Sequence, residues 1–146
     1  MSVGKKANRV LDKLRPLIFE RDGACVIAGT LWERLERCAG DLTLQHRAPR
    51  GMGGNSDIFN APENLVAMCM NHNRLERDSV SFRDFCRRNG YAMPRWVLEG
   101  RNGLDASMVP VRFIDGWFLL EGLDRRSISE DTALTFMVAL YGDDAE

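Results

Sequence analysis

Two short strand patterns, separated by a long stretch of turn-forming residues, constrain the fold of this chain most strongly. Residues 42–46 (LTLQH) alternate apolar and polar side chains, as a half-buried strand does, and residues 64–68 (NLVAM) are predicted to form a second short strand. Residues 47–62 between them are rich in Gly, Pro, Asn and Asp, which predicts a loop. A loop of about 16 residues is longer than compact domains usually contain, so this segment is a candidate functional site.

Helical patterns lie on both sides of these strands. Apolar residues recur at helical spacing in four segments, which are residues 5–22, 30–40, 70–78 and 80–90. In the second of these helices, Leu31 and Leu35 are expected to form the apolar stripe. The fourth segment either extends the third helix or starts a new one, for which Ser81 is the expected N-terminal cap.

The last third of the chain has a different pattern. Asp115-Gly116 lies between two apolar runs, which predicts a tight hairpin, and Ser129 is the expected cap of a final helix. That helix would turn an apolar face inward, formed by Leu134, Met137 and Leu140. We therefore predict an α+β fold. Residues 1–92 would form a core of an N-terminal helix and a strand–loop–strand–helix unit, and residues 93–146 a C-terminal hairpin and helix packed on it.

Composition and charge exclude several classes of protein. No apolar run approaches the roughly 20 residues that a membrane helix needs, and the charged N-terminus lacks an apolar signal core. We therefore expect a cytoplasmic protein with no membrane partner. Residues 1–101 carry 17 Lys and Arg against 12 Asp and Glu, a net charge of +5, whereas residues 102–146 carry 3 against 9, a net charge of −6. This asymmetry is compatible with a phosphate-binding face, or with an ordinary solvated surface.

Residues suited to chemistry gather between positions 45 and 73. Both histidines of the chain, His46 and His72, fall in this window. His46 is followed by Arg47, Arg50 and a glycine-rich stretch (GMGG), where the backbone can approach a phosphate closely. Phosphodiester hydrolysis needs an activated water, a cation that neutralises the leaving oxygen, and groups that hold the phosphate. The window offers candidates for each, although a lone His at a strand end is more often structural.

Three segments carry a resemblance to a known family: CVIAG, LTLQHRAPRGMGG and NAPENLVAMCMNHNRLE. They resemble the HNH endonucleases, in particular the small members carried by phages of actinobacteria. The similarity is strongest over residues 21–78 and continues more weakly into the C-terminal hairpin. It implies a ββα-metal fold, in which a β-hairpin and a helix hold one divalent ion (Mg²⁺ or Mn²⁺), and a DNA endonuclease activity in the cytosol of a host cell.

The resemblance also implies roles for single residues. His46 would be the general base that deprotonates the attacking water, and a neutral imidazole with a free pKa of about 6.5 suits that role. Asn64 would brace the long loop and so orient His46, and Asn73 would bind the catalytic metal. Gln45 stands at a metal-ligand position that usually holds Asp or His, and a neutral amide is a poorer partner for a hard cation.

Gln45 leaves a second interpretation open. An HNH-like scaffold with weakened metal binding could serve as a non-catalytic module that binds DNA or a protein, within phage packaging machinery or against a host factor. The presence of His46, Asn64 and Asn73 favours the enzyme. A homodimer is a further possible assembly.

A structural zinc site is a separate question. Many HNH proteins hold zinc between two Cys-x-x-Cys pairs, which in this chain read Cys25-x-x-Ala28 and Cys69-x-x-His72. Because Ala28 removes one thiolate, we expect no zinc unless Cys38 completes a Cys₃His set of ligands. Without zinc, the three cysteines are simply small buried residues.

Arg47, Arg50 and Arg74 are the predicted DNA contacts. A guanidinium beside a glycine-rich turn can grip a phosphate through two hydrogen bonds, which suits Arg50 in particular. Arg74 follows the predicted metal ligand Asn73 on the helix. The aromatic residues of the last third are expected to pack in the core.

Overall fold

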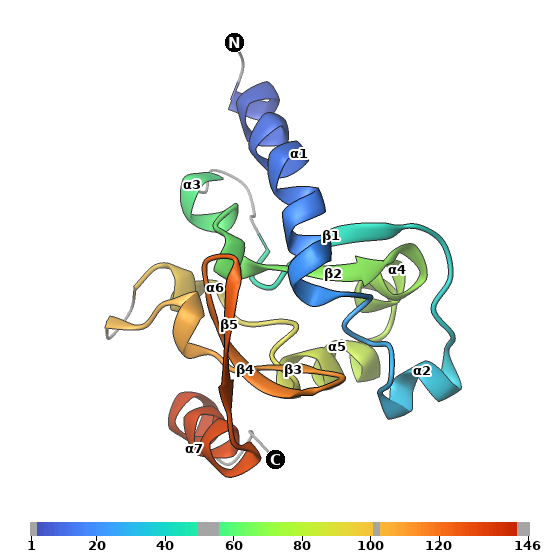
Figure 1. Cartoon of the computed structure of the whole chain (residues 1–146). Coiled ribbons are helices and arrows are strands. Elements are labelled where there is room, and N and C mark those ends of the chain that lie inside the picture. The colour runs from blue at the N-terminus through green and yellow to red at the C-terminus, as the bar shows by residue number, and fades with distance from the viewer. Residues whose placement is uncertain (1–2, 50–55, 101–102, 143–146) are drawn as a thin grey trace.

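A computed structural model describes residues 3–49, 56–100 and 103–142. Figure 1 shows a long first helix at one end of the molecule and the last helix at the opposite end, with two small sheets between them. The chain has a mixed α+β fold, as the sequence predicted. Within the described ranges, no helix is both long and apolar enough to cross a membrane.

The centre of the fold is a unit of two strands followed by a helix. β1 (Leu42–His46) and β2 (Leu65–Cys69) pair in antiparallel fashion, with Leu42 opposite Cys69 and His46 opposite Leu65. α4 (Met70–Asp78) begins directly after β2. All five residues of β2 are buried, which explains its continuous apolar sequence. The two strands and the helix predicted here are therefore confirmed.

The connection between the two strands is more ordered than a plain loop. It contains the short helix α3 (Ser56–Phe59) and a 3₁₀ turn, η1 (Pro62–Asn64). Pro62 lies at the start of that turn, where its fixed φ and missing N–H are tolerated. Residues 50–55, which include Arg50 and the glycine-rich stretch, lie outside the described residues.

The first helix, α1 (Val3–Asp22), is tied to β2 at its C-terminal end. Asp22 accepts a hydrogen bond from the N–H of Ala67 at 2.8 Å, and Arg21 donates to the carbonyl of Leu65. Arg21 and Asp22 also form an ion pair whose side chains are almost fully buried. The guanidinium of Arg21 and the carboxylate of Asp22 neutralise each other, and both also bond to the main chain of β2. This buried pair therefore fixes the position of α1 against the sheet.

The second helix is shorter than the sequence predicted. α2 (Leu31–Leu35) begins at the cap Thr30, whose hydroxyl accepts from the N–H of Glu33, but the chain becomes extended at Glu36. Leu31 and Leu35 are 73% and 76% exposed, so the prediction that they form the buried apolar face of this helix is wrong. The early end of α2 leaves the following segment free to run back toward β1.

α5 (Val80–Arg88) follows α4 after a single residue, and α6 (Arg95–Leu98) comes next. The cap of α5 is Ser79, whose hydroxyl accepts from the N–H of Phe82 at 3.1 Å. The prediction of Ser81 as the cap was wrong by half a turn, because Ser79 both ends α4 and starts α5.

The C-terminal part contains a second sheet and the last helix. β3 (Val111–Phe113) and β4 (Gly116–Glu121) form the predicted hairpin, with its turn at Ile114-Asp115, one residue before the predicted Asp115-Gly116. β5 (Asp124–Ile128) adds a strand that was not predicted from the sequence. β5 has the sequence DRRSI and no buried residue, so it lacks the apolar alternation that marks a strand. A short 3₁₀ turn, η3 (Ala106–Met108), precedes this sheet.

The last helix, α7 (Glu130–Tyr141), begins at the predicted cap Ser129, whose hydroxyl accepts from the N–H of Thr132. Of the three residues predicted to turn inward, Met137 is buried and Leu140 is partly buried, whereas Leu134 is 44% exposed. Ala133 takes the buried position instead.

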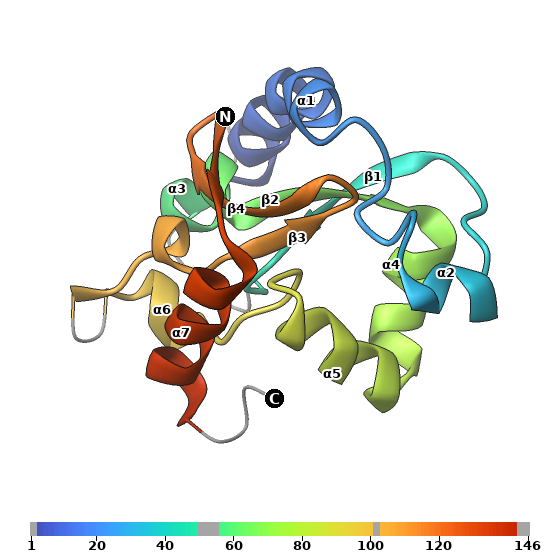
Figure 2. The ribbon, with the colours of Figure 1, turned by 60° about the horizontal axis from the view of Figure 1, so that its bottom comes forward.

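Two hydrophobic clusters hold these parts together, and both draw residues from before and after position 92. The first packs β2 and α5 against β3 and β4, and the second packs Ala48 and Phe59 against α6 and α7. Figure 2 shows β3 and β4 between the first sheet and α7. The C-terminal part therefore supports the segment that follows His46.

Candidate functional site

His46 stands at the end of β1, where the strand passes into the long connection. Its side chain is half-buried, and its Nε2 lies 2.8 Å from Oδ1 of Asn60. Because an amide oxygen only accepts, Nε2 carries the proton in this contact and Nδ1 keeps its lone pair. Asn60 is only 4% exposed. Asn60 was not predicted from the sequence, because no spacing rule brings position 60 to position 46.

Asn64 closes the connection between the strands from the other end. It is fully buried, and its Oδ1 accepts from the N–H of Ala48 at 2.8 Å. Its Nδ2 donates to the carbonyls of Ala48 and Phe59 at 3.1 and 2.8 Å. These hydrogen bonds join both ends of the connection and hold the chain two residues after His46. They are the contacts that a bracing residue needs, whereas the effect of Asn64 on catalysis stays a prediction.

A polar strip lies between β1 and α4, where the two predicted metal ligands are found. Nδ2 of Asn73 donates to Oγ1 of Thr43 at 2.7 Å. Two residues further along the strand, Nε2 of Gln45 donates to a carboxylate oxygen of Glu76 at 3.2 Å. Thr43 and Gln45 share one face of the strand, and Asn73 and Glu76 share one face of the helix. The structure thus places Gln45 and Asn73 on facing elements of the ββα unit, with His46 next to Gln45 in the chain but on the other face of the strand, and it adds Glu76, which was not predicted from the sequence.

Four metal-binding side chains converge at the other end of α4. The Sγ atoms of Cys25, Cys38 and Cys69 lie 3.7, 3.6 and 3.2 Å from Nδ1 of His72, and all four ligand atoms fall within 4.8 Å of one another. Nε2 of His72 donates to the carbonyl of Glu36 at 2.7 Å, which leaves Nδ1 as the ligand atom. This Cys₃His cluster could hold a metal ion.

Cys38 supplies the ligand that Ala28 lacks. It comes from the extended segment after α2 and not from the end of a helix, as the sequence analysis assumed. Burial raises the pKa of the Cys25 and Cys38 thiols above the ordinary value, so the protein alone does not favour thiolates there. A divalent metal is the group that would stabilise them. The alternative in which Cys38 completes a Cys₃His set therefore fits the geometry, whereas the expectation that no zinc is bound stays untested.

Arg47 does not reach a DNA-binding surface, which corrects its predicted role. Its side chain is 1% exposed, and burial lowers the pKa of Arg47 to about 9, so it stays charged at neutral pH. The guanidinium donates to four main-chain carbonyls, those of Glu63, Gly90, Ala106 and Val109, at 2.7 to 3.2 Å. Arg47 thus ties the segment after His46 to three parts of the chain far apart in sequence.

Replacing Arg47 with Met should destabilise the fold strongly. The substitution keeps much of the side-chain volume but leaves four buried carbonyls without their donor. At about 1 kcal/mol or more for each unsatisfied group, we expect the free energy of unfolding to fall by about 3 kcal/mol or more. Urea denaturation followed by circular dichroism measures it. An exposed arginine, Arg126, is the control, and an Arg47→Met protein as stable as the Arg126→Met protein would contradict this role.

Two grooves flank the polar strip. One, of about 620 Å³, is lined by Thr43, Asn73, Arg74 and Arg77 among others, and Arg74 is exposed there with a single hydrogen bond to Asn71. Arg74 therefore keeps a position from which it can meet a phosphate, whereas Arg50 lies outside the described residues.

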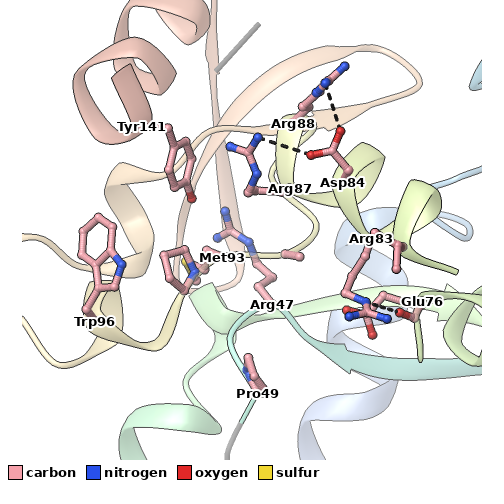
Figure 3. A pocket seen from close by; sticks show the side chains of 13 residues that line it. Arg47, Pro49, Glu76, Arg83, Asp84, Arg87, Arg88, Met93, Trp96 and Tyr141 are labelled. Atoms are coloured by element: carbon pink, nitrogen blue, oxygen red, sulfur yellow. Dashed lines mark hydrogen bonds and ion pairs between the residues drawn. The ribbon is translucent and has the colours of Figure 1, made fainter. Parts of the chain in front are cut away.

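The larger groove, of about 860 Å³, lies between α5 on one side and α6 and α7 on the other. Figure 3 shows Trp96 and Tyr141 along one wall, Arg83 and Glu76 at the opposite end, and Arg47 between them. Arg87 and Arg88 also line it, and both form ion pairs with Asp84. The groove thus leads from the polar strip along a basic and aromatic surface.

No protein-family model matches the chain, and no curated protein or solved structure matches it either. The functional conclusion therefore rests on the residues and the geometry described above.

Proposed function

We propose that the protein is a divalent-metal-dependent DNA endonuclease of the HNH, or ββα-metal, type, with His46 as its general base. One observation carries this proposal. A histidine whose Nδ1 keeps its lone pair ends the first strand of a ββα unit, one residue after Gln45, and the same strand and helix carry oxygen-bearing side chains that contact one another. The resemblance of the LTLQHRAPRGMGG segment to HNH endonucleases agrees with this arrangement.

Each residue of the candidate site has a role in the proposed reaction. Nδ1 of His46 takes the proton of the attacking water, while Asn60 holds the ring and Asn64 holds the chain that follows it. Amide oxygens of Gln45 and Asn73 fit a hard cation such as Mg²⁺ or Mn²⁺. When bound, such an ion would neutralise the charge that develops on the phosphate and the leaving oxygen. Conversion of supercoiled plasmid to the nicked form, dependent on added Mg²⁺ or Mn²⁺, tests the proposal.

A binding module without catalysis is the second candidate, because Gln45 stands where a charged ligand is usual. It predicts that the protein binds DNA yet leaves supercoiled plasmid intact at every Mg²⁺ and Mn²⁺ concentration. The plasmid assay therefore decides between the two functions.

We also propose that the Cys₃His cluster holds a structural zinc ion. Three thiols and one imidazole nitrogen are a common zinc set, and the cluster has no position left for a water or a substrate. The ion would join the segment after α1, the segment after α2, and the junction of β2 and α4. It would thereby fix the start of the helix that carries Asn73.

DNA binding should depend on Arg74. This exposed residue borders the groove beside Asn73, so we expect Arg74→Ala to weaken binding to unrelated DNA sequences alike. The slope of log affinity against log salt concentration should fall by about one unit, because one phosphate contact is lost. Fluorescence anisotropy at several salt concentrations measures both. The matched control is Arg126→Ala, on the exposed strand β5, and equal losses in the two variants would place the binding face elsewhere.

A further inference from the structure

Glu76 lies on α4 opposite Gln45, next to a proposed cation site whose other ligands carry no negative charge. Gln45, Asn73 and a neutral His46 together bring no negative charge, and a divalent cation is held weakly by neutral ligands alone. Glu76 carries a carboxylate to within 3.2 Å of the Gln45 amide. We propose that Glu76 is a direct ligand of the divalent cation and supplies the negative charge that Gln45 cannot. This inference rests on the proposed function, since it concerns the same metal site.

The hydrogen bonds of Gln45 use its NH₂ group and leave its amide oxygen without a partner among the described residues. Its Nε2 donates to Glu76 and to the carbonyl of His46, both at 3.2 Å, which uses the two N–H groups. The amide oxygen is then the atom left for a cation, and within the described residues no group donates to it. Because the NH₂ group of Gln45 faces the Glu76 carboxylate, a cation that binds between them displaces this hydrogen bond, and the amide turns its oxygen toward the cation beside the carboxylate.

The carboxylate of Glu76 has no competing cation among the residues that the structure describes. Arg83, which lines the same groove as Glu76, directs its guanidinium at main-chain carbonyls, those of Glu76 at 3.0 Å and Arg77 at 3.2 Å. Arg83 thus caps the end of α4 and forms no ion pair with the Glu76 side chain. Figure 3 shows the two side chains together at one end of the larger groove, where a phosphate could reach both the cation and Arg83.

Asn73 lies one helical turn before Glu76, and its amide donates to Thr43. Its oxygen therefore remains available on the same face of α4. The proposed ligand set is one carboxylate and two amide oxygens, completed by water and substrate oxygens, which is typical of Mg²⁺ and Mn²⁺ sites.

Mn²⁺ binding, measured by electron paramagnetic resonance of the free ion, tests this proposal without reference to activity. The protein is used with its Cys₃His cluster loaded with zinc. We expect Glu76→Gln to weaken Mn²⁺ binding by about tenfold or more, in the range seen when metal-site partners are removed. Gln at position 76 can still accept the hydrogen bond from Gln45, so the loss reports on the charge and not on the local fold. The matched control is Asp78→Asn, an exposed carboxylate two residues further along α4.

The outcomes separate this inference from the proposed function. Equal Mn²⁺ affinity of the wild-type and Glu76→Gln proteins, or no Mn²⁺ binding by the wild type, would overturn the role of Glu76, whatever the plasmid assay shows. Weaker binding by Glu76→Gln alone would support it, even if the wild-type protein leaves plasmid intact. In that case the proposed metal site would be supported and the proposed nuclease activity would be rejected.

Discussion

Replacing His46 with Ala should reduce the rate of plasmid nicking by at least about a hundredfold. A general base typically contributes a factor of about 10² to 10⁴, and within the described residues no other histidine has a ring nitrogen free for this role. His72 offers its Nδ1 to the cysteine cluster and its Nε2–H to the carbonyl of Glu36. Initial rates of nicking at saturating Mg²⁺ measure the effect. DNA binding should stay close to that of the wild type, because His46 is proposed to act on water and not to grip a phosphate.

The fold of the His46→Ala protein must be shown to be intact. Its only side-chain hydrogen bond in the described structure is the one to Asn60, so we expect a stability loss of only about 1 kcal/mol. Arg126→Ala, purified in the same way, controls for contaminating nucleases. If His46→Ala nicks plasmid at the wild-type rate, the histidine has no part in the reaction.

Removal of zinc should cause the largest loss of stability. The proposed ion joins the segment after α1, the segment after α2 and the junction of β2 and α4, and α2 leaves its own Leu31 and Leu35 exposed. Structural zinc sites contribute several kcal/mol to folding, which for a chain of this size corresponds to a fall in Tm of about 10 °C or more. Elemental analysis should find about one zinc per chain, and a strong chelator should lower the Tm by that amount.

A pair of cysteine variants makes this test specific. Cys69→Ser should lose the zinc and show the low Tm even without chelator. Cys86→Ala is the matched control, since Cys86 is also fully buried but lies outside the cluster, so it should keep the zinc. A purified wild-type protein that contains no zinc and whose Tm is insensitive to chelator would show that the four side chains are only core residues.

The elements that bury one face were readable from the sequence. Residues 42–46 alternate because Leu42 and Leu44 share one face of β1, while Thr43 and Gln45 meet α4 on the other. Asp115-Gly116 marks the region of the hairpin turn, although the turn residues are Ile114 and Asp115. By contrast, β5 has no buried residue and its strand is held by main-chain hydrogen bonds to β4. Main-chain hydrogen bonds leave no side-chain pattern, so this strand was missed.

Charged and polar residues were harder to place. Arg47 follows His46 in a basic, glycine-rich segment, so a surface role was expected, yet the fold closes four carbonyls around it. Three of those carbonyls belong to residues after position 89, far along the chain. No local rule can predict a partner set that forms only when α5, η3 and the second sheet come together.

The sequence by itself determined the strand–strand–helix order and the position of His46 at a strand end, because burial and turns require particular residue types at short, regular spacing. The resemblance to HNH endonucleases, and not spacing, named the candidate ligands, which are Gln45, Asn73, Cys25, Cys38, Cys69 and His72. Only the tertiary structure decided that Cys38 completes the cysteine cluster, that Asn60 holds His46 and that Glu76 faces Gln45. Each of these contacts joins residues from different elements, and their approach depends on how the helices pack on the sheet, which side-chain spacing along the chain does not encode.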